Sequence, residues 1–112
     1  MFPVYVSEST ERGANSAALV WAHGGGGVSL SASGENELMI RWAHKYKCIV
    51  FNVEYSLAPE WKSPKGPRDF MHTFLHVYEN AAKYNVDRTK IVIAGDSGGG
   101  FICLEAAYQL IL

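Results

Sequence analysis

The sequence has no excess of charge of either sign and no long apolar run. Its 112 residues carry a formal net charge of −1, which argues against the basic surface of a protein that binds nucleic acid or an anionic membrane. No apolar run reaches the roughly 18 residues of a membrane-spanning helix. Residues 1–8 lack the basic start and apolar stretch of a secretory signal. We therefore expect no nucleic-acid partner and no membrane span in this chain, with the cytoplasm as the default location.

Cysteine is also scarce, since only Cys48 and Cys103 are present. Neither belongs to a Cys-x-x-Cys pair or to another spacing typical of a metal site. Each lies in an apolar segment, so we predict two buried free thiols and a reducing compartment, with a disulfide as the alternative. We expect no cofactor and no metal.

What the sequence does contain is an alternation of apolar strands and amphipathic helices. Short apolar runs predict buried strands, and apolar residues at helical spacing predict helices. The predicted strands are residues 4–7, 17–22, 48–53 and 90–94, the first at a sheet edge, and the predicted helices are residues 35–46, 70–84 and 98–112. Residues 57–67 contain three prolines and predict a loop. This order predicts an α/β fold with one mostly parallel sheet covered by helices on both faces.

The last predicted helix is apolar nearly all round. Its only polar side chains are Glu105 and Gln109, so we expect it to be buried on most sides. It also carries no glycine or cation near its end that would stop a helix. We interpret the chain as truncated after this helix. The strand at residues 90–94 would then lack its next neighbour in the sheet, and Phe101, Leu104, Tyr108 and Ile111 of the helix would lose their cover and be exposed.

A G-x-S-x-G motif, Gly95-Asp96-Ser97-Gly98-Gly99, lies between the last predicted strand and the last predicted helix. In such a motif the chain turns sharply with the serine at its tip, and the small residues let strand and helix approach closely. The N–H groups at the helix N-terminus then point toward developing negative charge. We predict that Ser97 is a nucleophile on this turn. The alternative is a glycine turn with an incidental serine.

Four consecutive glycines, residues 24–27, follow His23 directly after a predicted strand. Glycine is needed where backbone N–H groups must approach a substrate oxygen without a Cβ in the way. The alternative is a phosphate-binding loop, but neither G-x-x-x-x-G-K-[ST] nor a helix-opening G-x-G-x-x-G is present. The pattern matches the HGGG oxyanion-hole loop. We interpret His23 as a structural residue that hydrogen-bonds within this loop.

Between the two motifs, residues 54–60 read Glu-Tyr-Ser-Leu-Ala-Pro-Glu, which is similar to a Y-R-L-A-P-E segment, and Pro64 and Asp69 follow. With both motifs in this order, the chain resembles the hormone-sensitive-lipase family of α/β-hydrolases, which includes arylacetamide deacetylases and many microbial carboxylesterases. The resemblance covers about residues 4–112 and implies a serine enzyme that hydrolyses small-molecule carboxylic esters. Residues 1–112 would then be the N-terminal, nucleophile-bearing part of an incomplete catalytic domain.

The resemblance also implies a role for individual residues. Ser97 would be the nucleophile, Gly24, Gly25, Gly26 and Gly98 would form the oxyanion hole, and His23, Asp96 and Tyr55 would give structural support. Two residues depart from the family pattern. Ser56 stands where an arginine is usual, and Gly27 stands where an aromatic or apolar residue is common.

The acid and the base of a catalytic triad are missing from this chain. In α/β-hydrolases both the acid and the base follow the serine in the sequence. The only acidic residue after Ser97 is Glu105. All four histidines precede Ser97, namely His23, His44, His72 and His76. We expect the last three histidines to lie on solvated helix faces. A chymotrypsin-like order of His23, Asp69 and Ser97 is rejected, because those enzymes are all-β and Ser97 opens an apolar helix. A non-catalytic ligand-binding module derived from the same fold remains the alternative function.

Overall fold

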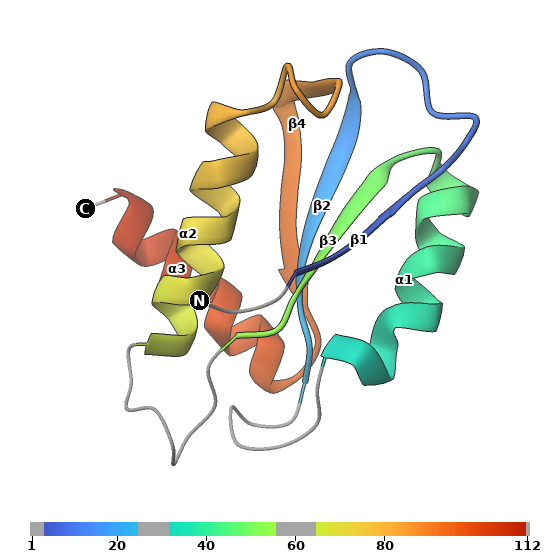
Figure 1. Ribbon diagram of the computed structural model, residues 1–112. Coiled ribbons are helices and arrows are strands. Elements are labelled where there is room, and N and C mark those ends of the chain that lie inside the picture. Colours follow the sequence, from blue (N-terminus) through green and yellow to red (C-terminus); the bar gives the residue numbers. More distant parts are fainter. Residues whose placement is uncertain (1–3, 25–31, 56–64, 112) are drawn as a thin grey trace.

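The computed structural model describes residues 4–24, 32–55 and 65–111, and Figure 1 shows their arrangement. Four strands form one sheet in the order β1-β3-β2-β4. The strands are β1 (Val4–Glu8), β2 (Ser16–Ala22), β3 (Ile49–Val53) and β4 (Val86–Gly95), and the helices are α1 (Ala32–Tyr46), α2 (Lys65–Glu79) and α3 (Gly98–Ile111). Strands β3, β2 and β4 are parallel, whereas β1 runs antiparallel to β3 at the edge. The predicted α/β class and the edge strand are confirmed.

The helices cover the two faces of the sheet, with α1 on one side and α2 and α3 on the other (Figure 1). Alternate side chains of β2 divide between the two layers. Trp21 packs with Met39 of α1, whereas Val20 belongs to the core under α2 and α3. All five residues of β3 are buried, because this strand lies inside the sheet and is covered on both faces.

The parallel strands end together at one edge of the sheet. In the register of the sheet, Ala22 at the end of β2 lies beside Val53 of β3 on one side and Gly95 of β4 on the other. The residues that follow the three strands therefore meet at this edge, although they lie far apart in the sequence. Crevices outside the carboxyl ends of parallel strands are where open α/β sheets bind ligands.

Helix α2 differs from its prediction at both ends. It begins at Lys65, inside the predicted loop, and it ends at Glu79 and not near residue 84. Residues 80–85 form turns instead, closed by Asn85 with a left-handed φ of 56°. Ala81 is buried and Tyr84 packs on the same core, so these turn residues imitate the apolar spacing of a continuing helix. Residues 57–64 of the predicted loop lie outside the described residues.

Helix α3 is not buried on most sides in this chain, but the predicted exposure of Phe101, Leu104 and Tyr108 is confirmed. Cys103 and Ala106 face the core, but Phe101 and Leu104 are each 72% exposed and Tyr108 is 62% exposed. Helix α3 packs on β4, β2 and α2 with one face, and among the described residues no element covers the opposite face. Strand β4 is likewise an edge of the described sheet, as predicted.

Both cysteines are buried and free, which confirms that prediction. Burial raises the pKa of the Cys103 thiol to about 12. Burial also raises the pKa of Cys48, with a smaller opposing effect from the Arg12 guanidinium. Because the thiolate is the reactive form, both thiols are poor nucleophiles.

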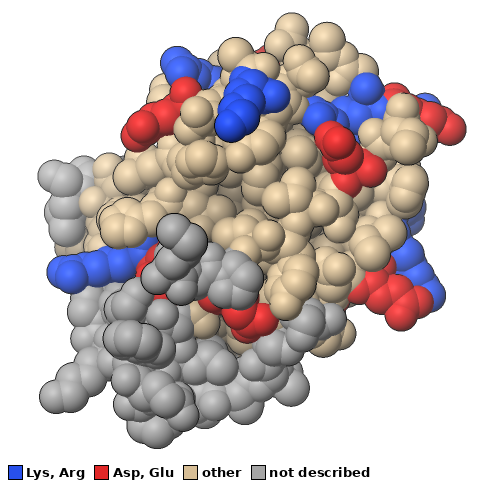
Figure 2. Space-filling model, in the orientation of Figure 1, with Lys and Arg blue, Asp and Glu red and all other residues tan. Residues whose placement is uncertain are grey.

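Charged side chains lie around the rim of the face shown in Figure 2, with basic and acidic groups near one another and uncharged residues across its middle. Arg12 is a mostly buried exception. Its guanidinium donates to the carbonyl oxygens of Tyr84 and Asn85, at 2.7 and 3.2 Å, and to Glu8 at 2.6 Å. Arg12 therefore connects the loop before β2 to the turn before β4 through hydrogen bonds. None of the helices within the described ranges is long and apolar enough to span a membrane.

Candidate active site

Ser97 lies on the strand-to-helix turn that the motif predicts. Strand β4 ends at Gly95 and helix α3 begins at Gly98, and Ser97 between them has a left-handed φ of 50°. The turn is closed by backbone hydrogen bonds from Gly99 N–H to the Asp96 carbonyl at 2.8 Å and from Gly100 N–H to the Ser97 carbonyl at 3.0 Å. A non-glycine residue in this conformation is strained, and such strain concentrates at functional sites. The Ser97 side chain is exposed.

The glycines of the turn are required by close backbone contacts. A Cβ on Gly99 would lie 1.9 Å from the carbonyl oxygen of Ala22, at the end of β2. A Cβ on Gly95 would lie 2.5 Å from the backbone of Gly99. Such distances are far inside van der Waals contact, so only glycine lets α3 start directly against β2 and β4.

The glycine loop begins beside this turn. A Cβ on Gly24 would lie 3.1 Å from the carbonyl oxygen and 3.2 Å from a carboxylate oxygen of Asp96. The end of β2 and the end of β4 therefore bring Gly24 next to Asp96, the residue before Ser97. Gly25, Gly26 and Gly27 lie outside the described residues.

His23 is completely buried beneath the start of the glycine loop. Its Nδ1 lies 2.7 Å from the carbonyl oxygen of Gly24, and because a carbonyl can only accept, Nδ1 carries the proton. The imidazole stacks on the ring of Tyr55 at 4.4 Å, and the Tyr55 hydroxyl donates to the His23 carbonyl at 2.7 Å. Tyr55 thus contacts His23 through both its ring and its hydroxyl, and a structural role for His23 stays a prediction.

Tyr55 is held in its neutral form. Burial, followed by the negative charge of Asp96 and of nearby glutamates, raises the pKa of Tyr55 to about 12. The hydroxyl therefore remains a hydrogen-bond donor throughout the physiological pH range.

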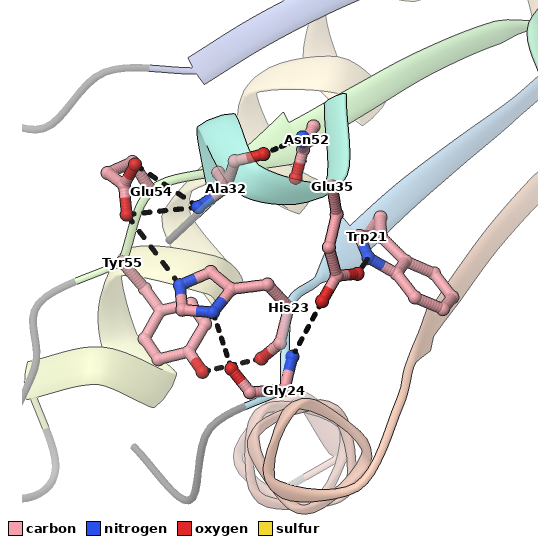
Figure 3. Close-up of polar contacts among 8 residues, drawn as sticks. All are labelled: Trp21, His23, Gly24, Ala32, Glu35, Asn52, Glu54 and Tyr55. Carbon is pink, nitrogen blue, oxygen red and sulfur yellow. Dashed lines mark hydrogen bonds and ion pairs between the residues drawn. The ribbon is translucent and has the colours of Figure 1, made fainter. Parts of the chain in front are cut away.

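Sequence reasoning missed two carboxylates at this edge, Glu35 and Glu54 (Figure 3). Glu35, in the first turn of α1, accepts from the Trp21 indole at 2.9 Å and from Gly24 N–H at 3.4 Å. Glu54, which follows β3, accepts from Ala32 N–H, with both oxygens at 3.2 Å. The signal that could have found Glu54 was its place directly after a buried parallel strand, at the edge where the other motif residues meet.

The remaining histidines do not join this site. His44 is exposed near the far end of α1, and His72 and His76 are exposed on α2, as predicted for solvated helix faces. His76 lies 2.8 Å from the Tyr84 hydroxyl. Within the described ranges, no three metal-binding side chains are grouped so that they could hold an ion. The parallel sheet with its helices also excludes the chymotrypsin-like reading of His23, Asp69 and Ser97.

The fold and the strand-to-helix turn define an α/β-hydrolase. A family model described as the alpha/beta hydrolase fold matches residues 19–111, so the chain belongs to that family. Its similarity to proteins of the arylacetamide deacetylase type places it in the hormone-sensitive-lipase group, which is an esterase-like group.

Three relatives illustrate the match. The chain is 35% identical over 81% of its length to an AB hydrolase superfamily protein of Schizosaccharomyces pombe. It is 32% identical over 83% of its length to human arylacetamide deacetylase-like 3. The structure of a hyperthermophilic esterase from the archaeon Pyrobaculum calidifontis matches 98% of the chain, with a TM-score of 0.91 and 33% identity. The chain spans only 27%, 23% and 36%, respectively, of the lengths of these three proteins.

Proposed function

We propose that this chain supplies the nucleophile and the oxyanion hole of a serine carboxylesterase that acts on small-molecule esters. The observation that carries the proposal is Ser97 at a φ of 50°, on a turn whose glycines pack against the end of β2. The Ser97 Oγ would attack the ester carbonyl carbon while its proton passes to a general base. The alcohol would leave with a proton, and water would then hydrolyse the acyl-serine ester to release the acid and restore Ser97.

The oxyanion donors that we propose are the N–H groups of Gly25, Gly26 and Gly98. Gly98 stands at the first position of α3, where a helix N–H has no intrahelical partner. Gly24 is removed from the predicted set of donors because its N–H is directed to Glu35. We assign Gly24 a different role, since its missing Cβ lets the loop start against Asp96.

His23 is unsuited to act as the base. Its ring is fully buried, Nδ1 donates to Gly24, and Nε2 lies 3.6 Å from a Glu54 oxygen. We therefore propose that the acid and the base come from residues outside these 112. The relatives that share this segment are several times longer, and the names arylacetamide deacetylase and esterase support acyl esters as the substrate class.

The test is Ser97→Ala in the full-length protein that carries this chain, assayed with a short-chain 4-nitrophenyl ester. We expect kcat to fall on the order of 10⁶-fold, the loss seen when a triad serine is removed. A fluorophosphonate probe should label the unmodified protein and fail to label the variant. Ser7→Ala, on β1 at the other edge of the sheet, is the matched control. Undiminished turnover by Ser97→Ala would overturn the proposal, and ester binding without any turnover would favour the ligand-binding module.

A further inference from the structure

Two carboxylates accept hydrogen bonds from the backbone on either side of residues 25–31 (Figure 3). Gly24 precedes that segment and donates its N–H to Glu35, and Ala32 follows the segment and donates its N–H to Glu54. Each carboxylate comes from a different element, Glu35 from α1 and Glu54 from the end of β3.

Each carboxylate is itself fixed to the protein core. The second oxygen of Glu35 accepts from the indole of Trp21, which packs edge to face on Trp42 at a ring separation of 5.1 Å. At the other end, the Ala32 carbonyl also accepts from the buried Asn52 side chain at 2.7 Å. Both the N–H and the carbonyl of Ala32 are thus held by residues of the β3 end. Gly24 and Ala32 are therefore held by side chains of α1 and of the end of β3.

We propose that Glu35 and Glu54 are positioning residues for the oxyanion hole, because they hold the main chain of Gly24 and Ala32, the described residues on either side of the proposed donors Gly25 and Gly26. This inference rests on the proposed function, because it concerns the same site. Oxyanion donors act through preorganisation, so a small displacement of their backbone weakens transition-state stabilisation more than it weakens substrate binding. Glu35 acts on Gly24, one residue before the first donor that we propose. Glu54 acts at the far end of the segment.

Glu35→Gln gives the sharpest test because it removes one acceptor and leaves two donors. A glutamine has a single carbonyl oxygen, which cannot serve both Trp21 and Gly24 in the arrangement seen for Glu35. We expect kcat to fall about 10- to 100-fold, less than the 10²–10³-fold cost of deleting an oxyanion donor, with KM changed by less than about threefold. The matched control is Glu37→Gln on the same helix, whose side chain is 83% exposed and pairs only with exposed Arg41 in the described structure.

A second substitution should restore the lost activity. Trp21→Phe removes the competing indole donor, which frees the glutamine oxygen of Glu35→Gln for the Gly24 N–H. We expect the double variant to regain kcat relative to Glu35→Gln alone, by about threefold or more. If Glu35 had a purely structural role, the losses of kcat caused by Glu35→Gln and Trp21→Phe would add, because each substitution would weaken the packing further.

At Glu54 we expect the glutamine variant to keep most of the activity, in contrast to Glu35→Gln. Both of its oxygens lie near one main-chain donor, so the single oxygen of a glutamine can still accept from Ala32. The glutamine amide can also donate to the His23 Nε2, which has no hydrogen-bond donor in the described structure. Glu54→Ala should lower kcat about 10- to 100-fold, and Glu54→Gln should restore most of that loss.

A spectroscopic readout separates this inference from the proposed function. In protein labelled with [¹⁵N]tryptophan, the Trp21 indole N–H signal, assigned through Trp21→Phe, should shift in Glu35→Gln and stay unchanged in Glu37→Gln. If Ser97→Ala abolishes turnover but Glu35→Gln and Glu54→Ala leave kcat unchanged, the positioning role is overturned and the proposed function stands. If Ser97→Ala retains turnover, the proposed function is overturned, and the positioning inference falls with it even where the indole signal shifts.

Discussion

Gly99 lies where helix α3 comes nearest to strand β2. A Cβ there would sit 1.9 Å from the Ala22 carbonyl oxygen, and both are main-chain atoms that cannot swing aside as a side chain can. We predict that Gly99→Ala lowers the free energy of unfolding by about 3 kcal/mol, the upper range for overpacking, and that it displaces Ser97. Chemical denaturation and esterase turnover of the full-length protein measure the two effects.

The control for Gly99→Ala is the neighbouring glycine. A Cβ on Gly100 would lie 3.4 Å from its nearest neighbour, the Gly95 carbonyl oxygen, at the border of ordinary contact. Because alanine favours a helix over glycine by about 1 kcal/mol, Gly100→Ala should leave stability unchanged or raise it slightly. If both substitutions lower the free energy of unfolding equally, the close contact with Ala22 is not the reason that residue 99 must be glycine.

Tyr55 gives the site a predictable response to alkaline pH. Its pKa is raised from 10.0 to about 12 in the folded chain, so the unfolded state loses the proton first as pH rises. The stabilisation that neutral Tyr55 contributes is therefore complete below pH 10 and is lost between pH 10 and about 12. Tyr55→Phe should lower stability at neutral pH, by about 1 kcal/mol for the lost bond to His23, and the deficit should shrink across that window.

Urea denaturation at about pH 9 and about pH 11 tests this response, with the exposed Tyr108→Phe as control. Tyr108→Phe should change neither the stability nor its slope. A deficit of Tyr55→Phe that stays constant up to pH 11 would contradict the assignment of the raised pKa to this hydroxyl.

At the scale of single residues, the sequence identifies the groups that lie within a motif and misses those that meet only in space. The position of Ser97 on a tight strand-to-helix turn follows from the local motif, although the backbone atom that requires Gly99 belongs to the distant Ala22. Glu35 and Glu54 act on residues 11 and 22 positions away. The local sequence around Glu35 and Glu54 does not indicate which main-chain N–H each one binds. These pairs form only once the sheet has brought the segments together.

Among the elements, strands and helices with clean apolar spacing were predictable, and their ends were less so. Helix α2 shows why. In the sequence, Ala81 and Tyr84 continue the apolar spacing of α2. In the structure, they pack on the core from the turns that follow Glu79. The sequence signal for burial is thus the same whether the chain continues as a helix or folds back onto the same core.

The turn between α2 and β4 depends on Asn85. Its φ of 56° suits asparagine and glycine, and its carbonyl accepts from Ser16 N–H at 2.9 Å. We predict that Asn85→Val lowers the free energy of unfolding by about 1–2 kcal/mol, the cost of a left-handed conformation for a residue with a Cβ, and that Asn85→Gly leaves it nearly unchanged. Thermal unfolding of both variants checks this, with Ala82→Val in the same exposed turn as control. Similar losses from valine and glycine would refute the conformational explanation.

For the whole molecule, the site follows from one topological fact. Because β3, β2 and β4 are parallel and end in register, three segments separated by about thirty to forty residues arrive at one edge. The sequence predicts this meeting, since it predicts parallel strands each followed by a motif. It does not predict which side chains bridge the segments.

Within the part of the chain that the structure describes, α3 has an exposed outer face and β4 is an edge strand, and these two features determine how the 112-residue chain should behave by itself. Phe101, Leu104 and Tyr108 project from one face of α3, and Val92 on β4 is 55% exposed. Covering a large apolar side chain contributes about 1.5–3 kcal/mol, so three on one face offer a free-energy gain comparable to the 5–15 kcal/mol stability of a whole domain. An unpaired strand edge beside such a face invites association.

We therefore predict that the isolated chain self-associates and does not turn over esters at enzyme rates. Sedimentation velocity over a range of concentrations should show species larger than the monomer. The triple variant Phe101→Lys, Leu104→Glu, Tyr108→Lys should shift the population toward the monomer, because it removes apolar surface without touching the core residues Cys103 and Ala106. Turnover should be absent in both forms, since His23 is buried and engaged and the other three histidines lie exposed on α1 and α2. An isolated chain that stays monomeric, unfolds cooperatively and hydrolyses esters at enzyme rates would mean that these 112 residues contain their own base.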